Sequence, residues 1–186
     1  MTVEEVFSKV AIRMIEGLMF HEEMANYYEF LGLYGYAECH EYHYLDESCH
    51  FHKLSKYYIT HYNKLLPELK AEDPEVIPST WYKYSRMDVD TNTIRSSVKT
   101  GLEKWVKWES DTKKLYEAMY KELINLDEGA AALKIAELVE DVSKELKHAT
   151  QYHLNKKAID YDIITIIDEQ NCEKSKYEAK MRTVYY

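Results

Sequence analysis

The sequence predicts an all-α protein in which four long helices form two hairpins, joined by a long crossover and followed by an extra C-terminal helix. Three observations predict this fold class. Glycine (5) and proline (3) are scarce among the 186 residues, which argues against a fold that needs many tight turns. Apolar residues recur at steps of three and four over long stretches. All three prolines fall between residues 67 and 78, so they interrupt the helical pattern at one place.

The first hairpin is expected at the N-terminal end of the chain. Residues 3–32 contain no proline, and a turn is expected at residues 33–36, around Gly35. Residues 37–66 form a second proline-free stretch, which Pro67 ends. The first stretch follows the helical period in its apolar and small residues, namely Val3, Phe7, Val10, Met14, Gly17, Phe20, Met24, Tyr28 and Leu31.

The second hairpin is expected after a connection over residues 67–91, where polar runs accompany the prolines. Thr91 or Asn92 can cap the third helix, which runs to about Leu126. Residues 127–129 then form a short turn before the fourth helix.

The four helices are expected to form one domain over residues 1–158, with residues 159–186 as a C-terminal helix and tail. The tail helix is expected over 159–183, with Ile163, Ile166, Ile167, Tyr177 and Met181 facing inward. The long connection fits this arrangement, because a helix of about 28 residues is about 42 Å long. Twenty-odd extended residues, at up to about 3.3 Å each, can carry the chain back along the bundle. The helix order is then up-down-down-up.

Composition and charge argue against several functional classes. Lys and Arg number 24 and Asp and Glu number 33, a net charge of −9 that argues against a general nucleic-acid binder and suits a protein that attracts cations. The N-terminus lacks a basic start followed by an apolar run, and no stretch is long enough to span a membrane. The three cysteines form no Cys-x-x-Cys motif, as is typical of reduced thiols in the cytosol. We therefore expect a cytoplasmic protein without a nucleic-acid or membrane partner.

Two Glu-x-x-His motifs are candidates for metal ligands. Glu47 and His50 fall in the second helix, and Glu145 and His148 in the fourth. This spacing places the carboxylate and the imidazole on one face of a helix. Each motif alone is a weak signal, but here the second helix of each hairpin carries one.

The other two helices can supply carboxylates at the same height. Glu109 interrupts an otherwise largely apolar stripe of the third helix, where a buried carboxylate is costly without a cation or a donor. In an antiparallel hairpin, two residues that are equally far from the turn lie at the same height. Glu109 and Glu145 are equally far from the turn at residue 127, and Glu23 and Glu47 are equally far from Gly35. The sequence does not decide which glutamate of the first helix takes this position. The alternatives to Glu23 are Glu22, one residue away, and Glu16, on the same face.

These six residues and the helix order resemble the ferritin-like superfamily, in particular members with Glu-x-x-His on helices two and four, such as bacterioferritin and rubrerythrin. The resemblance covers about residues 5–155 and implies a di-iron carboxylate centre. It implies that Glu47 and Glu145 bridge the two irons. Glu23 and Glu109 would be terminal carboxylates, and His50 and His148 would each bind one iron. Haem is not expected, since Ser48 stands where the bacterioferritin haem methionine would be.

The resemblance implies a ferroxidase, which oxidises iron(II) with dioxygen or hydrogen peroxide in iron storage or oxidative-stress defence, and which forms a homo-oligomer. The expected cofactor is two non-haem iron ions, with manganese as an alternative. His43, one turn before Glu47, is either a further ligand or a hydrogen-bonded packing group. Two other functions remain open: a di-iron oxidase or peroxidase acting on a small substrate without storing mineral, and a metal-free helical interaction module.

Overall fold

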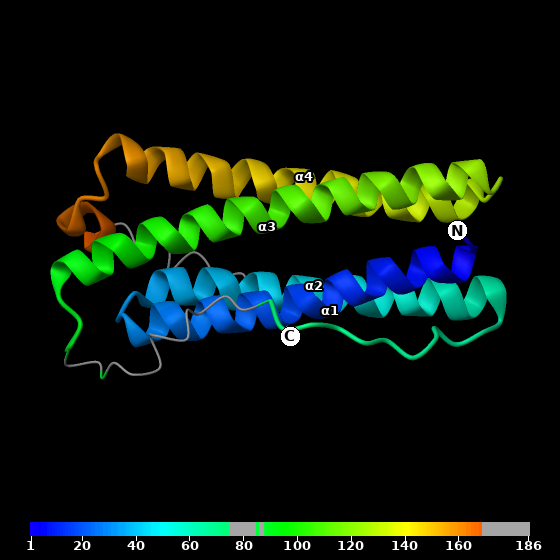
Figure 1. Ribbon diagram of the computed structural model, residues 1–186, viewed down its shortest axis with the longest axis horizontal. Coiled ribbons are helices and arrows are strands. Elements are labelled where there is room, and N and C mark those ends of the chain that lie inside the picture. The colour runs from blue at the N-terminus through cyan, green and yellow to red at the C-terminus, as the bar shows by residue number, and fades with distance from the viewer. Residues whose placement is uncertain (75–84, 86–87, 169–186) are drawn as a thin grey trace.

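The computed structural model describes residues 1–74, 85 and 88–168, and this part contains helices and no strand. The four long helices are α1 (Val3–Phe30), α2 (Tyr34–Tyr62), α3 (Thr91–Asn125) and α4 (Gly129–Ala158). Figure 1 shows two antiparallel hairpins, α1 with α2 and α3 with α4, that lie along each other. The chain direction is up-down-down-up, so the predicted helix order is confirmed.

The crossover begins at the far end of the bundle from the α1–α2 turn. It runs back along the first hairpin toward the start of α3 (Figure 1). Its backbone is fixed to α1 where the amide of Glu72 donates to Oε1 of Glu16, at 3.5 Å. The described part of the connection therefore returns along the bundle as its length predicts. Residues 75–84, which include the aromatic residues Trp81, Tyr82 and Tyr84, lie outside the described residues.

Helix ends follow local capping chemistry, which corrects two predicted boundaries. Asp90 caps α3 in place of Thr91 or Asn92, because its carboxylate accepts the amide of Thr93 at 2.7 Å. Helix α2 ends at Tyr62 rather than at residue 66, because Asn63 adopts the left-handed conformation at φ 52°.

The turn between α1 and α2 lies three residues earlier than predicted. Gly32 has a φ of 76°, which glycine adopts without a steric penalty. The amide of Leu33 donates to the carbonyl of Tyr28 at 2.9 Å, the bond pattern that closes many helix ends at such a glycine. Gly35, the predicted turn residue, lies instead inside the first turn of α2. The second turn lies at residues 126–128, close to its predicted place.

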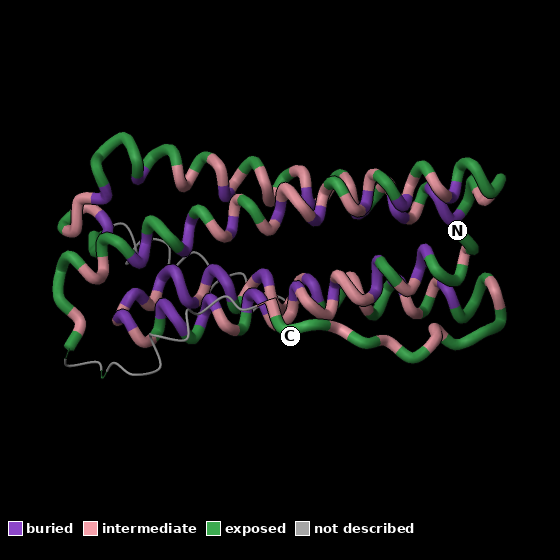
Figure 2. The backbone as a smooth tube through the Cα atoms, in the orientation of Figure 1, coloured by how far each residue is buried: buried purple, intermediate pink, exposed green. Residues whose placement is uncertain are grey.

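The apolar core is divided into two clusters along the bundle. Figure 2 shows that the buried residues lie on the helix faces turned toward the inside of the bundle. The cluster near the α1–α2 turn is built around Phe20, Tyr28 and Trp105. The cluster at the other end is built around Met14 and Tyr116, together with residues such as Val6, Phe7, Tyr58, Leu123 and Ile135. Along α2 and α3, buried polar residues fall between the residues of the two clusters: His43, Glu47, Glu109 and Thr112.

The C-terminal helix begins at residue 163 and is described to residue 168. Tyr161 and Ile166 are buried and join the cluster near the α1–α2 turn. The tail thus packs against the end of the bundle. The predicted continuation of this helix to residue 183 lies outside the described residues. No helix in the described part has the length and apolar character needed to cross a bilayer.

Candidate metal centre

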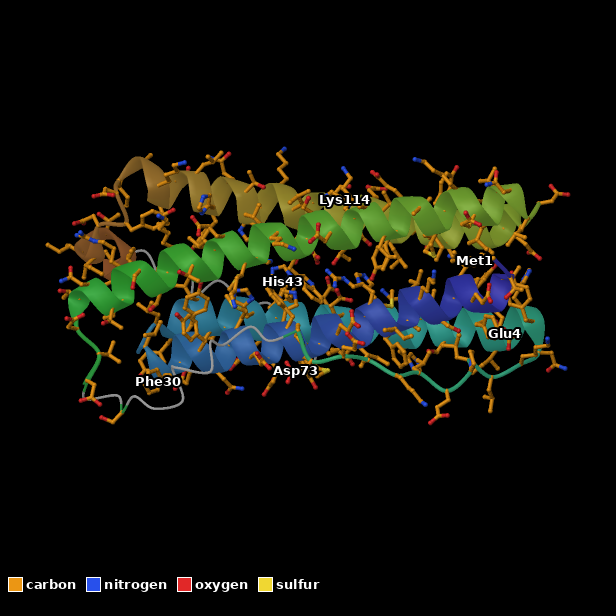
Figure 3. The ribbon with its side chains drawn as sticks, in the orientation of Figure 1. Met1, Glu4, Phe30, His43, Asp73 and Lys114 are labelled. Atoms are coloured by element: carbon orange, nitrogen blue, oxygen red, sulfur yellow. The ribbon has the colours of Figure 1, made fainter. Side chains whose placement is uncertain are left out.

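Five buried or half-buried side chains form a polar layer between the two apolar clusters: Glu47, Glu109, Glu145, His21 and His43. All four long helices contribute to it. Figure 3 labels His43 near the middle of the bundle, between the two hairpins. Carboxylates placed inside a helical bundle are costly unless a cation or hydrogen-bond donors stabilise them.

Glu109 is the most buried carboxylate of the polar layer, with 1% of the residue exposed. The indole Nε1 of Trp105 donates to its Oε1 at 3.0 Å, and Nε2 of His21 lies 3.7 Å from the same oxygen. Burial, together with the charge of Glu145, raises the pKa of Glu109 to about 8. Glu109 is therefore largely protonated at neutral pH in the chain alone, and its ionised form would gain from a bound cation.

Glu47 projects from α2 toward α1 and is 8% exposed. Its pKa is raised well above the ordinary value by burial and then by the charges of Glu145 and Glu109. Its charge acts in turn on Tyr116, whose hydroxyl is buried and has no hydrogen-bond partner in the described structure. The three carboxylates of α2, α3 and α4 thus form one electrostatically connected group.

Helix α1 presents a glycine, not a carboxylate, at the level of Glu47. A β-carbon built on Gly17 would lie 3.0 Å from Oε1 of Glu47. The register follows from the observed turn, because Gly17 precedes Gly32 by fifteen residues and Glu47 follows it by fifteen.

Glu23 is half-buried and lies about 200° around α1 from His21, at about 100° per residue, so it is on a different face of α1 from the histidine that contacts Glu109. Of the two alternatives, Glu22 is exposed, and Glu16 is half-buried with its Oε2 3.6 Å from Nη1 of Arg13.

His43 pairs with the third carboxylate. Its Nδ1 lies 3.5 Å from Oε1 of Glu145, and neither ring nitrogen has a hydrogen-bond partner in the described structure. Burial acts to lower the pKa of His43, but Cys39 and Glu145 outweigh it and raise the pKa well above its usual value. His148, the histidine of the same Glu-x-x-His motif, is half-buried, with its ring 6.5 Å from that of His43.

His50 lies at the edge of the site, where its Nε2 is 3.7 Å from Oδ2 of Asp141 on α4. The two residues line a cavity of about 200 Å³ between α2 and α4, together with Lys53, Leu54, Tyr57, Lys134, Glu137 and Leu138. His50 is one turn from Glu47, and Asp141 is one turn from Glu145. The cavity therefore adjoins the polar layer.

Two more buried histidines were missed by the sequence reasoning. Nδ1 of His21 lies 3.0 Å from Nδ1 of His40, and burial is the main cause that lowers the pKa of both imidazoles well below the usual value. Both rings are therefore neutral at neutral pH. The helical period gives a signal for His21, because it follows Gly17 by four residues and precedes Met24 by three.

Arg13 is a further group that the sequence reasoning missed. Its guanidinium carbon lies 3.3 Å from the ring centre of Trp108, and its Nε donates to Oγ1 of Thr112 at 2.8 Å. Its charge acts to lower the pKa of Glu109, although burial of that carboxylate has the larger effect. Arg13 is therefore a fixed cation beside the polar layer.

The donor chemistry of the polar layer suits iron, which binds carboxylate oxygens and imidazole nitrogens. The unpartnered nitrogens of His21 and His43 show that this buried region has unused ligand capacity. Among the described residues, however, no three His, Cys, Asp or Glu side chains converge as ligands of one ion. The donors stand as histidine–carboxylate pairs beside Glu47.

Comparison with known proteins relates this chain to solved structures. No protein-family model and no curated protein sequence matches it. An open-pore ferritin from the hyperthermophilic archaeon Archaeoglobus fulgidus superposes with a TM-score of 0.75, covering 92% of this chain and 94% of that one at 15% identity. An engineered closed form of the Archaeoglobus fulgidus ferritin gives a TM-score of 0.76 at 15% identity, covering 94% and 96%. A humanized archaeal ferritin gives 0.74 at 14% identity, covering 92% and 94%.

Proposed function

Because the chain has the ferritin-like fold, we propose that it binds iron(II) in the polar layer and oxidises it with dioxygen or hydrogen peroxide. The observation that carries this proposal is the meeting of Glu47, Glu109 and Glu145, from three helices, at one level of the bundle. Iron is here the substrate and, in a storage protein, the cargo.

The raised pKa values of Glu47 and Glu109 support a role in cation binding. Both carboxylates retain protons because burial and mutual repulsion disfavour their charged forms. A divalent cation would replace those protons and supply the missing positive charge. Without a bound cation, this set of buried carboxylates would lower the stability of the folded state.

The proposed ligands are five of the six residues that the sequence suggests. Glu47 and Glu145 would bridge two iron ions and Glu109 would be a terminal ligand, while His50 and His148 would each bind one ion. Glu23 is not among the proposed ligands, because the residue of α1 that lies against Glu47 is Gly17. Manganese is the alternative metal, since it accepts the same donors.

The biological setting that we propose is iron storage or oxidative-stress defence, by a homo-oligomer in the cytoplasm. The archaeal ferritins that share this fold support the storage reading. Light scattering distinguishes the assemblies, because a cage has a mass of hundreds of kilodaltons, whereas a small-substrate oxidase would be a monomer or dimer. The cavity beside His50 favours that second candidate, since it could admit a small organic substrate.

The test is an iron(II) oxidation assay. The purified chain is mixed with anaerobic iron(II) and then with dioxygen or hydrogen peroxide, and ferric absorbance is followed. Glu47→Gln and Glu109→Gln are expected to reduce the initial rate at least tenfold. Glu140→Gln is the matched control, because the Glu140 side chain is 72% exposed. Oxidation no faster than in buffer would contradict the proposed function and favour a metal-free interaction module.

A further inference from the structure

We propose that His21 and His43 are metal ligands, each acting with one carboxylate, so that the polar layer is a nitrogen-rich site that also takes cobalt(II) and zinc(II). His21 acts with Glu109, and His43 acts with Glu145. The inference rests on the proposed function only in requiring that the polar layer binds metal. It changes the ligand set that the Glu-x-x-His motifs suggest.

The first argument is the state of the imidazole nitrogens. His21 is 1% exposed and His43 is 5% exposed. Nε2 of His21 and both ring nitrogens of His43 are buried without a hydrogen-bond partner in the described structure. Buried polar atoms almost always have a hydrogen-bond partner. Here three ring nitrogens in one layer have none, and two of them lie no closer than 3.5 and 3.7 Å to a carboxylate oxygen, which indicates that a binding partner belongs between nitrogen and oxygen.

The second argument is the separation within each pair. The N···O distances are 3.7 Å for His21 with Glu109 and 3.5 Å for His43 with Glu145. Both exceed the usual N–H···O range of about 2.7–3.2 Å. Two ligand atoms each about 2.1 Å from a common ion in tetrahedral geometry are separated by about 3.4 Å. The His43–Glu145 pair is close to this spacing, and the His21–Glu109 pair is about 0.3 Å wider.

The third argument is the hydrogen bond that orients His21. Nδ1 of His21 lies 3.0 Å from Nδ1 of His40, so one of the two nitrogens donates to the other. When His21 donates, its Nε2 carries a lone pair directed toward Glu109. A metal-binding histidine typically donates its other ring N–H in this way, which fixes the ring orientation.

The pairs also have a structural consequence, because each joins the two hairpins. His21 of α1 faces Glu109 of α3, and His43 of α2 faces Glu145 of α4. An ion held by either pair would therefore tie one hairpin to the other. Bound metal should raise the unfolding temperature, and this effect is independent of any oxidation.

The test is an anaerobic titration with cobalt(II), followed by its visible absorption bands and by the unfolding temperature. The native chain is expected to bind two ions and to unfold at a higher temperature with cobalt(II). His21→Gln and His43→Gln should each lose one ion per chain, with weaker bands. His52→Gln is the matched control, because His52 is exposed on α2. The metal-free unfolding temperatures establish that the variants fold.

Two outcomes would overturn the inference. One is cobalt(II) binding by His21→Gln and His43→Gln that equals binding by the native chain. The other is a native chain that binds no cobalt(II), in which case the pairs are buried histidine–carboxylate contacts only. Cobalt(II) binding that depends on these histidines, without iron(II) oxidation, would support the inference and contradict the proposed function.

Discussion

Gly17 of α1 lies against the side chain of Glu47 of α2, so closely that a β-carbon on residue 17 would stand 3.0 Å from Oε1 and 3.1 Å from Cδ. The missing side chain leaves the space that the Glu47 carboxylate occupies. Helix α1 therefore shapes the site through a glycine, and it contributes His21 one turn further on.

The Gly17→Ala substitution should displace the Glu47 carboxylate by a few tenths of an ångström. We expect weaker iron(II) binding, because the moved carboxylate no longer faces Glu109 and Glu145 as before. Alanine favours a helix interior over glycine by about 1 kcal/mol, so the free energy of unfolding should change little or rise. Calorimetric titration with iron(II) and urea unfolding measure the two effects. Unchanged iron(II) affinity would contradict the role given to Gly17.

The Gly101→Ala substitution should destabilise the protein. A β-carbon there would overlap Oη of Tyr28, which is fully buried, and would lie 3.1 Å from Cε of Met24. Overpacking of this kind costs about 1–3 kcal/mol, against a helix-propensity gain of about 1 kcal/mol. Urea unfolding should show the loss, and adding Tyr28→Phe should restore part of it.

A matched control for that experiment is Gly129→Ala. A β-carbon at Gly129, the first residue of α4, meets nothing within 4 Å. The free energy of unfolding of the Gly129→Ala variant should be equal to that of the native protein or slightly higher. Equal losses in the two variants would show that crowding at Tyr28 is not the cause.

The raised pKa of Glu109 should make the metal-free protein less stable as the pH rises from about 6.5 to about 8. This range lies above the ordinary histidine pKa of 6.5, near which His21 and His40 act in the opposite direction because their pKa values are lowered. Glu109 has an ordinary pKa of 4.5, and in the folded chain burial and Glu145 raise its pKa to about 8. Between these values the folded state holds a proton that the unfolded state has lost, so raising the pH favours unfolding. Unfolding in urea at a series of pH values measures the slope.

The Glu109→Gln variant should lessen this slope, while Glu47 continues to contribute in the same direction. Glu103→Gln, an exposed change on the same helix, should leave the slope as it is. An unchanged slope in Glu109→Gln would contradict the raised pKa.

The fold was largely predictable because two independent sequence patterns, each extending over long stretches of the chain, indicate it. The helical periodicity and the confinement of the prolines to residues 67–78 each predict two hairpins with a crossover. The exact turn was not predictable, because Gly32 and Gly35 are both plausible turn residues. Only the left-handed backbone at Gly32 decides between them.

That three-residue shift explains why the site was only partly anticipated. The second turn lies where it was predicted, so the pairing of Glu109 with Glu145 has the correct register. The first turn lies three residues earlier than predicted. The residue of α1 at the height of Glu47 is therefore Gly17 rather than Glu23. His21 of α1 and His40 of α2 belong to no Glu-x-x-His motif, and their burial depends on packing between helices, which the sequence pattern does not specify.

Anomalous diffraction at the iron edge, from crystals prepared anaerobically with iron(II), tests the central claim most directly. The account predicts two iron peaks in the polar layer, within bonding distance of Glu47, Glu109 and Glu145. Crystals of the Glu47→Gln variant should show reduced occupancy there. An empty polar layer in iron-soaked native crystals, with iron only at exposed carboxylates, would contradict the account.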